Sequence, residues 1–146
     1  MKKIEGWVTA PQGFIAAGVK AGIKASGNHD VAVIFSTVPA ACGAVFTQNK
    51  MCAAPVLVSR EVNKHGYAQA IAVNSGCANA CTGEQGLADA KKMQAHTAEL
   101  LGIAPEAVFV CSTGVIGQFL PMDKLLTGIA DAVDSLDECE GESCAM

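Results

Sequence analysis

A short apolar run that turns abruptly polar and glycine-rich constrains the fold of this chain most strongly. Residues 107–110 (Ala-Val-Phe-Val) predict a buried strand, and residues 111–117 (Cys-Ser-Thr-Gly-Val-Ile-Gly) follow directly. Gly114 can adopt a positive φ and lets a ligand approach the main chain closely. Backbone N–H groups on such a turn, with the Thr113 hydroxyl beside them, can hold an oxyanion. Because Pro121 suits the first turn of a helix, the sequence predicts a strand, a candidate functional loop and a helix in succession.

The same arrangement occurs a second time, earlier in the chain. Residues 70–73 predict a strand, and a run of small polar residues, 74–83, follows it. Four of these residues are candidates to line a pocket beside the first loop: Asn74, Ser75, Gly76 and Asn79. For both loops, a plain turn is a competing interpretation, because Thr, Asn, Ser and Gly are the usual turn residues. On residue types alone, a turn capped by Thr113 is the simpler interpretation of the first loop.

The remaining segments predict a mixed α/β or α+β layered fold in one domain spanning residues 1–146. A long helix over 84–101 has the three-to-four spacing of an amphipathic helix, with Thr82 and Gln85 as a capping box. A second helix is predicted from 121 to 136, followed by a frayed acidic tail from about 137. The other expected elements are short bent strands within 6–27, strands over 31–35, 44–47 and 55–58, and a brief helix over 59–64.

Composition excludes several classes of function. Hydrophobic residues make up 51% of the chain and charged residues 16%, which excludes a disordered protein. The net charge of −4 gives no basic surface for nucleic acid. No apolar run reaches the length of a membrane span, and the N-terminus lacks the apolar core of a signal peptide. We therefore expect a cytoplasmic protein with no nucleic-acid or membrane partner.

Cysteines and histidines do not predict a metal site. The seven cysteines form no C-x-x-C pair, and without an export signal they are expected to be reduced, small core residues. Cys77 and Cys81 lack the second ligand pair of a zinc site. Cys111 is expected in the core, inert rather than nucleophilic, because an apolar environment raises a thiol's pKa. The three histidines are scattered in a turn, at a helix end and on a helix face (His29, His65 and His96).

Seven sequence blocks, in this order, resemble one known family. They are VTAPQGF (8–14), GAVFTQN (43–49), AAPV (53–56), NSG (74–76), ANACTG (78–83), STGVIG (112–117) and LPMDK (120–124). The chain resembles the N-terminal (α) part of the ornithine acetyltransferase family, also called glutamate N-acetyltransferase. The resemblance extends from about Gly6 to at least Gly128.

This resemblance implies a specific chemistry. Members of the family transfer an acetyl group from N-acetylornithine to glutamate in arginine biosynthesis, some also accept acetyl-CoA, and no cofactor is required. The family precursor cleaves itself, and the N-terminal threonine of the resulting β chain becomes the nucleophile. The resemblance assigns Thr113 and Gly114 to the oxyanion hole. It further implies a sandwich fold of the N-terminal-nucleophile-like type found in self-processing aminopeptidases, and an α2β2 assembly.

The sequence departs from the family pattern in two respects. Cys77 stands where the family usually has Asn, so one pocket contact is expected to be lost or replaced. The family continues with substrate-contact and cleavage segments that do not occur before Met146, so this chain alone is expected to be inactive. Two other interpretations stay open: a truncated, non-catalytic fragment, and a binding module that holds a small anion or amino acid on the two glycine loops.

Overall fold

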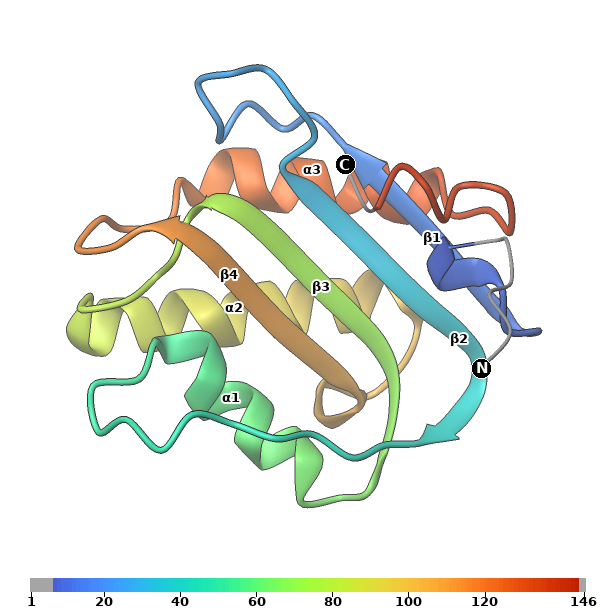
Figure 1. Ribbon diagram of the computed structural model, residues 1–146, viewed down its shortest axis with the longest axis horizontal. Coiled ribbons are helices and arrows are strands. Elements are labelled where there is room, and N and C mark those ends of the chain that lie inside the picture. The colour runs from blue at the N-terminus through green and yellow to red at the C-terminus, as the bar shows by residue number, and fades with distance from the viewer. Residues whose placement is uncertain (1–6, 145–146) are drawn as a thin grey trace.

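The computed structural model describes residues 7–144, which form one mixed four-stranded sheet packed against helices (Figure 1). The strands are β1 (Phe14–Val19), β2 (Val31–Ala41), β3 (Tyr67–Cys77) and β4 (Val108–Val115), and they lie in sequence order across the sheet. The helices are α1 (Ala54–Asn63), α2 (Gly83–Leu101) and α3 (Met122–Asp134), with short 3₁₀ turns at Trp7–Thr9 and Pro105–Ala107. β1–β2 and β2–β3 pair antiparallel, whereas β3 and β4 pair parallel across the α2 crossover. The expected mixed α/β fold is confirmed.

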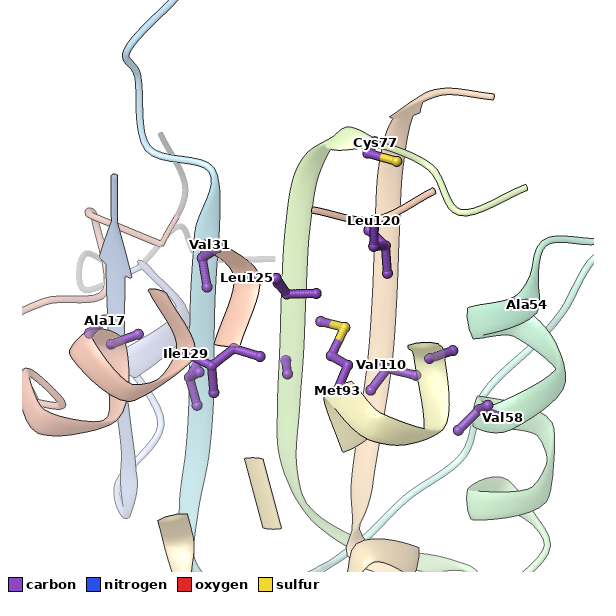
Figure 2. Close-up of a cluster of buried hydrophobic side chains, with 14 residues drawn as sticks. Ala17, Val31, Ala54, Val58, Cys77, Met93, Val110, Leu120, Leu125 and Ile129 are labelled. Atoms are coloured by element: carbon purple, nitrogen blue, oxygen red, sulfur yellow. The ribbon is translucent and has the colours of Figure 1, made fainter. Parts of the chain in front are cut away.

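Helices cover only one face of the sheet. Figure 1 shows α2 and α3 crossing behind the strands, with the other face, which we call the open face, toward the viewer. Side-chain burial alternates along β3 as this arrangement requires: Ala70 and Ala72 are buried, and Ile71 between them is exposed. In the core, Met93 of α2 and Leu125 of α3 meet strand residues such as Val110 (Figure 2). The small alanines of β3 allow these larger helix side chains to pack close to the sheet.

A single hydroxyl joins α1 to the edge strand. Ser59 is buried and donates a hydrogen bond to the Val110 carbonyl at 2.8 Å, while the Val110 N–H donates to Ser59 Oγ at 3.1 Å. The Gln94 side chain of α2 donates to the Val108 carbonyl at 3.0 Å. An edge strand otherwise leaves such groups unpaired and ready to pair with another chain. α1 and α2 therefore seal this edge and fix β4 in position.

Two predicted strands are wrong, and both lie between β2 and β3. Residues 55–58 were expected as a strand but form the start of α1, where Pro55 occupies the first turn and needs no N–H partner. Ser59, expected at the start of a brief helix, lies in the middle of this one. Residues 44–47 form no strand and run as an irregular segment.

The N-terminal and C-terminal predictions also need correction. β2 continues past Pro39 to Ala41, with an irregular register between Phe35 and Ala40 at which a residue without an N–H is tolerated. Within the described part of 6–27, the only strand is β1. The described part of the tail, 137–144, is not frayed: Asp137 and Ala16 exchange backbone hydrogen bonds at 3.1 and 3.2 Å, and Ser143 Oγ accepts one from the Gly18 N–H at 3.0 Å.

Both long helices are confirmed, but the expected capping box is not. α2 ends at Leu101, the next residue Gly102 has a φ of +66° that suits glycine, and α3 lies within the predicted range. Thr82 Oγ1 does not cap α2 and instead donates to Asn79 Oδ1 at 2.8 Å. The Gln85 side chain donates to Asp89 on the next turn.

The prediction that the cysteines are core residues holds only for Cys77. Cys81, Cys111 and Cys139 are exposed, and the other three are partly buried, with all seven thiols free. Within residues 7–144 no group of three or more His, Cys, Asp or Glu side chains is arranged to hold a metal ion. In the same part of the chain, no helix is long and apolar enough to cross a membrane.

We predict that Ser59→Ala destabilises the chain by about 2 kcal/mol, because it leaves the Val110 N–H and carbonyl unpaired at a buried position. Urea unfolding monitored by circular dichroism measures the change. Ser26→Ala, at an exposed turn position, is the matched control and should stay within about 0.5 kcal/mol of wild type. Equal stability of the two variants would contradict the role given to Ser59.

Candidate functional site

The two glycine-containing motifs meet at the carboxyl ends of β3 and β4. Both were expected as loops after their strands, but the strands extend further, and the motifs pair directly in the parallel ladder. Ser75 is the register partner of Thr113, and Gly76 is the partner of Gly114. The motifs are therefore side by side, as predicted, but as paired backbone rather than as two turns.

Gly114 occupies a position that only glycine fits. Its φ is +129°, and a Cβ built on it would lie 2.3 Å from the Gly76 carbonyl carbon and 2.7 Å from the Cys77 nitrogen. Gly76 has a φ of +110°, and a Cβ there would lie 3.1 Å from a methyl carbon of Ile23. The two backbones are thus packed directly against each other, which fixes the orientation of the main-chain groups at this point.

Thr113 presents a free hydroxyl next to Gly114. The residue is exposed, and along β4 it alternates with the buried Val110 and partly buried Ser112, so its side chain belongs to the open face. Among residues 7–144, the Thr113 hydroxyl has no hydrogen-bond partner. It is available to donate to an oxygen atom of a bound molecule.

Asn74 and Ser112, the next register pair, lie on the helix side of the sheet. Asn74 is fully buried, and its amide donates to the Cys77 carbonyl at 2.8 Å, which holds the end of β3. Asn74 Oδ1 and Ser112 Oγ are the buried side-chain oxygens of the described chain that have no partner. Since they are neighbours in the ladder, one water molecule between them would satisfy both.

Asn79 connects two helices and does not lie on the open face. It is fully buried with a φ of +48°, donates to the Gly86 carbonyl at 2.8 Å and accepts from the Thr82 hydroxyl. Its own carbonyl accepts a hydrogen bond from the Ala54 N–H at 3.2 Å. Asn79 therefore connects the beginnings of α1 and α2.

The Cys77 thiol contacts the segment that follows β4. The side chain is buried, and its sulfur lies 3.4 Å from the Gln118 carbonyl and 3.6 Å from the Phe119 carbonyl. An S–H group is a weak donor, so these contacts are weak ones. That a pocket contact of the family is lost or replaced here stays a prediction.

A groove of about 640 Å³ runs along the open face beside β4. Its lining includes Ile71, Phe109 and the irregular segment 42–46, and Ser112 is the last residue of β4 that lines it. Arg60 fixes the segment, because its guanidinium lies 5.9 Å from the Phe46 ring centre and donates to the Thr47 carbonyl. Thr113 does not line the groove but follows Ser112 directly on β4.

Cys111 lies in this groove, not in the core as expected. Although the residue as a whole is exposed, the groove walls remove part of the water around its sulfur, and this desolvation raises the pKa of its thiol. The predicted core position of Cys111 is wrong, and its inertness stays a prediction.

The loop between β1 and β2, residues 20–30, adds residues that the sequence did not single out. Buried Asp30 accepts three backbone hydrogen bonds through its carboxylate, from Ala21 at 2.7 Å, Ile23 at 2.6 Å and Lys24 at 2.9 Å. Its carbonyl accepts a fourth from the Ser75 N–H at 2.8 Å. Figure 1 shows this loop at the same end of the sheet as the carboxyl ends of β3 and β4. An aspartate after an Asn/Gly turn is a recognisable signal, but its partners depend on the tertiary fold.

The relatives found by comparison with known proteins agree with one another in family. The profile of the ArgJ family matches residues 15–146. The arginine biosynthesis bifunctional protein ArgJ of Caldanaerobacter subterraneus subsp. tengcongensis is 52% identical over 145 residues, which cover 99% of this chain and 36% of that protein. The protein of the same name from Lactococcus lactis subsp. lactis is 53% identical over 130 residues, covering 89% of this chain and 33% of that protein. The chain spans about a third of the length of these curated relatives.

Solved structures show the same fold. The ornithine acetyltransferase of Mycobacterium tuberculosis, determined in complex with ornithine, aligns with a TM-score of 0.93 and 46% identity, over 96% of this chain and 77% of that chain. The arginine biosynthesis bifunctional protein argJ of Bacillus halodurans aligns with a TM-score of 0.88 and 43% identity, over 95% of this chain and 73% of that chain.

We predict that Gly114→Ala destabilises the chain by about 3 kcal/mol, because the new Cβ meets the Gly76 backbone and the φ is unfavourable for alanine. Gly117→Ala is the matched control: its φ is +75°, but open space surrounds the new Cβ, so only about 1 kcal/mol is expected. Urea unfolding compares the two variants, and backbone amide exchange at Gly76 and Cys77 reports the local change. A Gly114→Ala variant as stable as Gly117→Ala would show that the backbones are not in contact.

Proposed function

The chain belongs to the ArgJ family, and from that membership we propose that it forms the oxyanion-hole side of an ornithine acetyltransferase that transfers acetyl from N-acetylornithine to glutamate. The observation that carries the proposal is the pairing of Ser75–Gly76 with Thr113–Gly114, which leaves a free hydroxyl beside a backbone position restricted to glycine. The solved relative determined with ornithine supports the choice of substrate.

Thr113 and Gly114 act on the acetyl carbonyl. A nucleophilic oxygen adds to the carbonyl carbon of N-acetylornithine, and the carbonyl electron pair moves to its oxygen. The Thr113 hydroxyl and the Gly114 N–H donate hydrogen bonds to this oxyanion. These bonds stabilise the transition state more than the ground state, because the donors are already oriented toward the developing charge. Collapse re-forms the carbonyl, breaks the C–N bond and releases ornithine, whose amine takes up the proton. The glutamate amine then attacks the acetyl-enzyme by the same route in reverse.

The nucleophile in this proposal is the N-terminal threonine of a β chain, with its own α-amine as the base. Thr113 cannot fill that role, because its nitrogen is part of a peptide bond inside β4. The β chain lies on the open face, where the groove of about 640 Å³ and exposed residues such as Ile71 lack a covering layer within the described chain. The proposal includes an α2β2 assembly, in which β-chain strands complete an N-terminal-nucleophile-like sandwich; the uncovered open face supports it by offering a surface for a second layer.

We predict that purified 1–146 alone transfers no acetyl group from N-acetylornithine to glutamate, because it lacks a threonine with a free amine. Chromatographic detection of N-acetylglutamate measures the reaction. The positive control is a full-length relative assayed under the same conditions. Transfer by 1–146 alone, above the rate with heat-unfolded chain, would contradict the proposal.

We predict that Thr113→Val in the assembled enzyme lowers kcat by about 100-fold with little change in KM, since one oxyanion donor is lost while substrate contacts remain. Thr113→Ser keeps the hydroxyl and should restore most of the rate. The exposed Thr127 on α3 supplies the control, because Thr127→Val should leave kcat within about twofold of wild type. A Thr113→Val variant with a raised KM and an unchanged kcat would show instead that Thr113 contributes to ground-state substrate binding.

A further inference from the structure

A cavity of about 180 Å³ lies beside the paired motifs, between the 20–30 loop and the open face. Its polar lining includes Lys24, His29 and Ser75, and Val73 forms part of its apolar wall. Ser143 closes one side, since its carbonyl lies 3.1 Å from His29 Nδ1. The cavity is separate from the groove along β4, and it reaches the site through Ser75, the register partner of Thr113.

The Lys24 ammonium group in this cavity lacks a counter-charge. Its Nζ donates one hydrogen bond, to the His29 carbonyl at 2.8 Å, which leaves two of its three protons unused. No carboxylate lies within 4 Å of it in the described chain, where Lys64 and Glu61 form the ion pair. Lys24 is half-buried, so part of its hydration is lost without replacement. The Ser75 hydroxyl also has no hydrogen-bond partner among residues 7–144.

Asp30, the acidic residue of this cavity, does not serve as the missing counter-charge. Its carboxylate accepts hydrogen bonds from three backbone N–H groups, and this holds the 21–24 segment in place. As a result the Lys24 stem rests on the end of β3, where its Cγ would lie 3.3 Å from a Cβ on Gly76. The fold therefore fixes the position of the ammonium group, which a flexible surface side chain would leave variable.

We infer that Lys24, with the Ser75 hydroxyl, binds a carboxylate group of the amino-acid substrate. This inference rests on the proposed function and adds a substrate contact to it. Adjacent strands lie about 4.8 Å apart, so Ser75 and Thr113 are close neighbours on the same face. An N-acetylated amino acid carries its carboxylate a few bonds from its acetyl carbonyl, and the inference places the carboxylate at Lys24 and the acetyl group at Thr113.

Titration of the assembled enzyme, in which this chain is isotopically labelled, with acetate and with ornithine tests this site, followed by backbone amide chemical shifts at constant ionic strength. In the wild type, saturable shifts are expected at Lys24, Ser75 and Gly76. Lys24→Met keeps the stem on Gly76 and removes the charge, and it should raise the Kd about tenfold. Lys24→Arg should bind within about threefold of wild type. Lys20→Met, an exposed lysine on the same loop, is the control and should not change the Kd.

Three results would overturn the inference: no saturable binding in the wild type, equal binding by Lys24→Met, or shifts confined to other parts of the chain. If Lys24→Met does not fold, Lys24→Arg and Ser75→Ala are compared instead. The Kd is expected to rise about threefold in Ser75→Ala and not in Lys24→Arg. The assembled enzyme separates this inference from the proposed function. If Lys24→Met transfers acetyl with an unchanged KM, the inferred carboxylate site is refuted and the proposed acetyltransferase function stands. If a carboxylate binds at Lys24 but no acetyl group is transferred, the inferred site stands and the proposed function is refuted.

Discussion

The direct contact between the Gly76 and Gly114 backbones is the constraint on which the rest of the structure depends. It requires a parallel pairing of β3 and β4 in one register, because a shift by one residue would put a side chain into the contact. That register places Thr113 beside Ser75 on the open face and Asn74 beside Ser112 toward the helices. The 20–24 segment, held by Asp30, packs on Gly76 from the other side. The arrangement of the site therefore follows from backbone packing, with few side chains involved.

The one-sided layering explains how such a site remains accessible. α2 and α3 bury the helix-facing residues of the sheet, and the Ser59 hydroxyl pairs with the outer edge of β4. The other face keeps Ile71 and Phe109 at the surface of a groove. A stable helix-facing layer and a partly apolar open face are what a chain needs if a second layer is to complete it while Thr113 stays exposed.

The sequence predicted those features that depend on local pattern. The periodicity of α2 and the glycine-rich run after β4's apolar residues were sufficient to find the helix and the candidate oxyanion donors. Residues 55–58 were misassigned because a short apolar run fits a strand and a helix equally well, and the proline that starts a helix also occurs at strand ends. The roles of Asn74, Asn79 and Lys24 could not be predicted, since strand direction, the face of each side chain and loop packing are tertiary properties. The assignment of Thr113 and Gly114 as oxyanion donors came from the family resemblance and stays a prediction.

The central claim is that Thr113 and Gly114 stabilise an oxyanion formed when a threonine of another chain attacks the acetyl group. Intact-mass analysis of the complex isolated from cells through this chain, before and after exposure to N-acetylornithine, tests it most directly. The account predicts a second polypeptide that begins with threonine and gains the mass of one acetyl group, while the polypeptide that contains residues 1–146 keeps its mass. Isolation of the chain alone, or acetylation of a residue within it, would contradict the account.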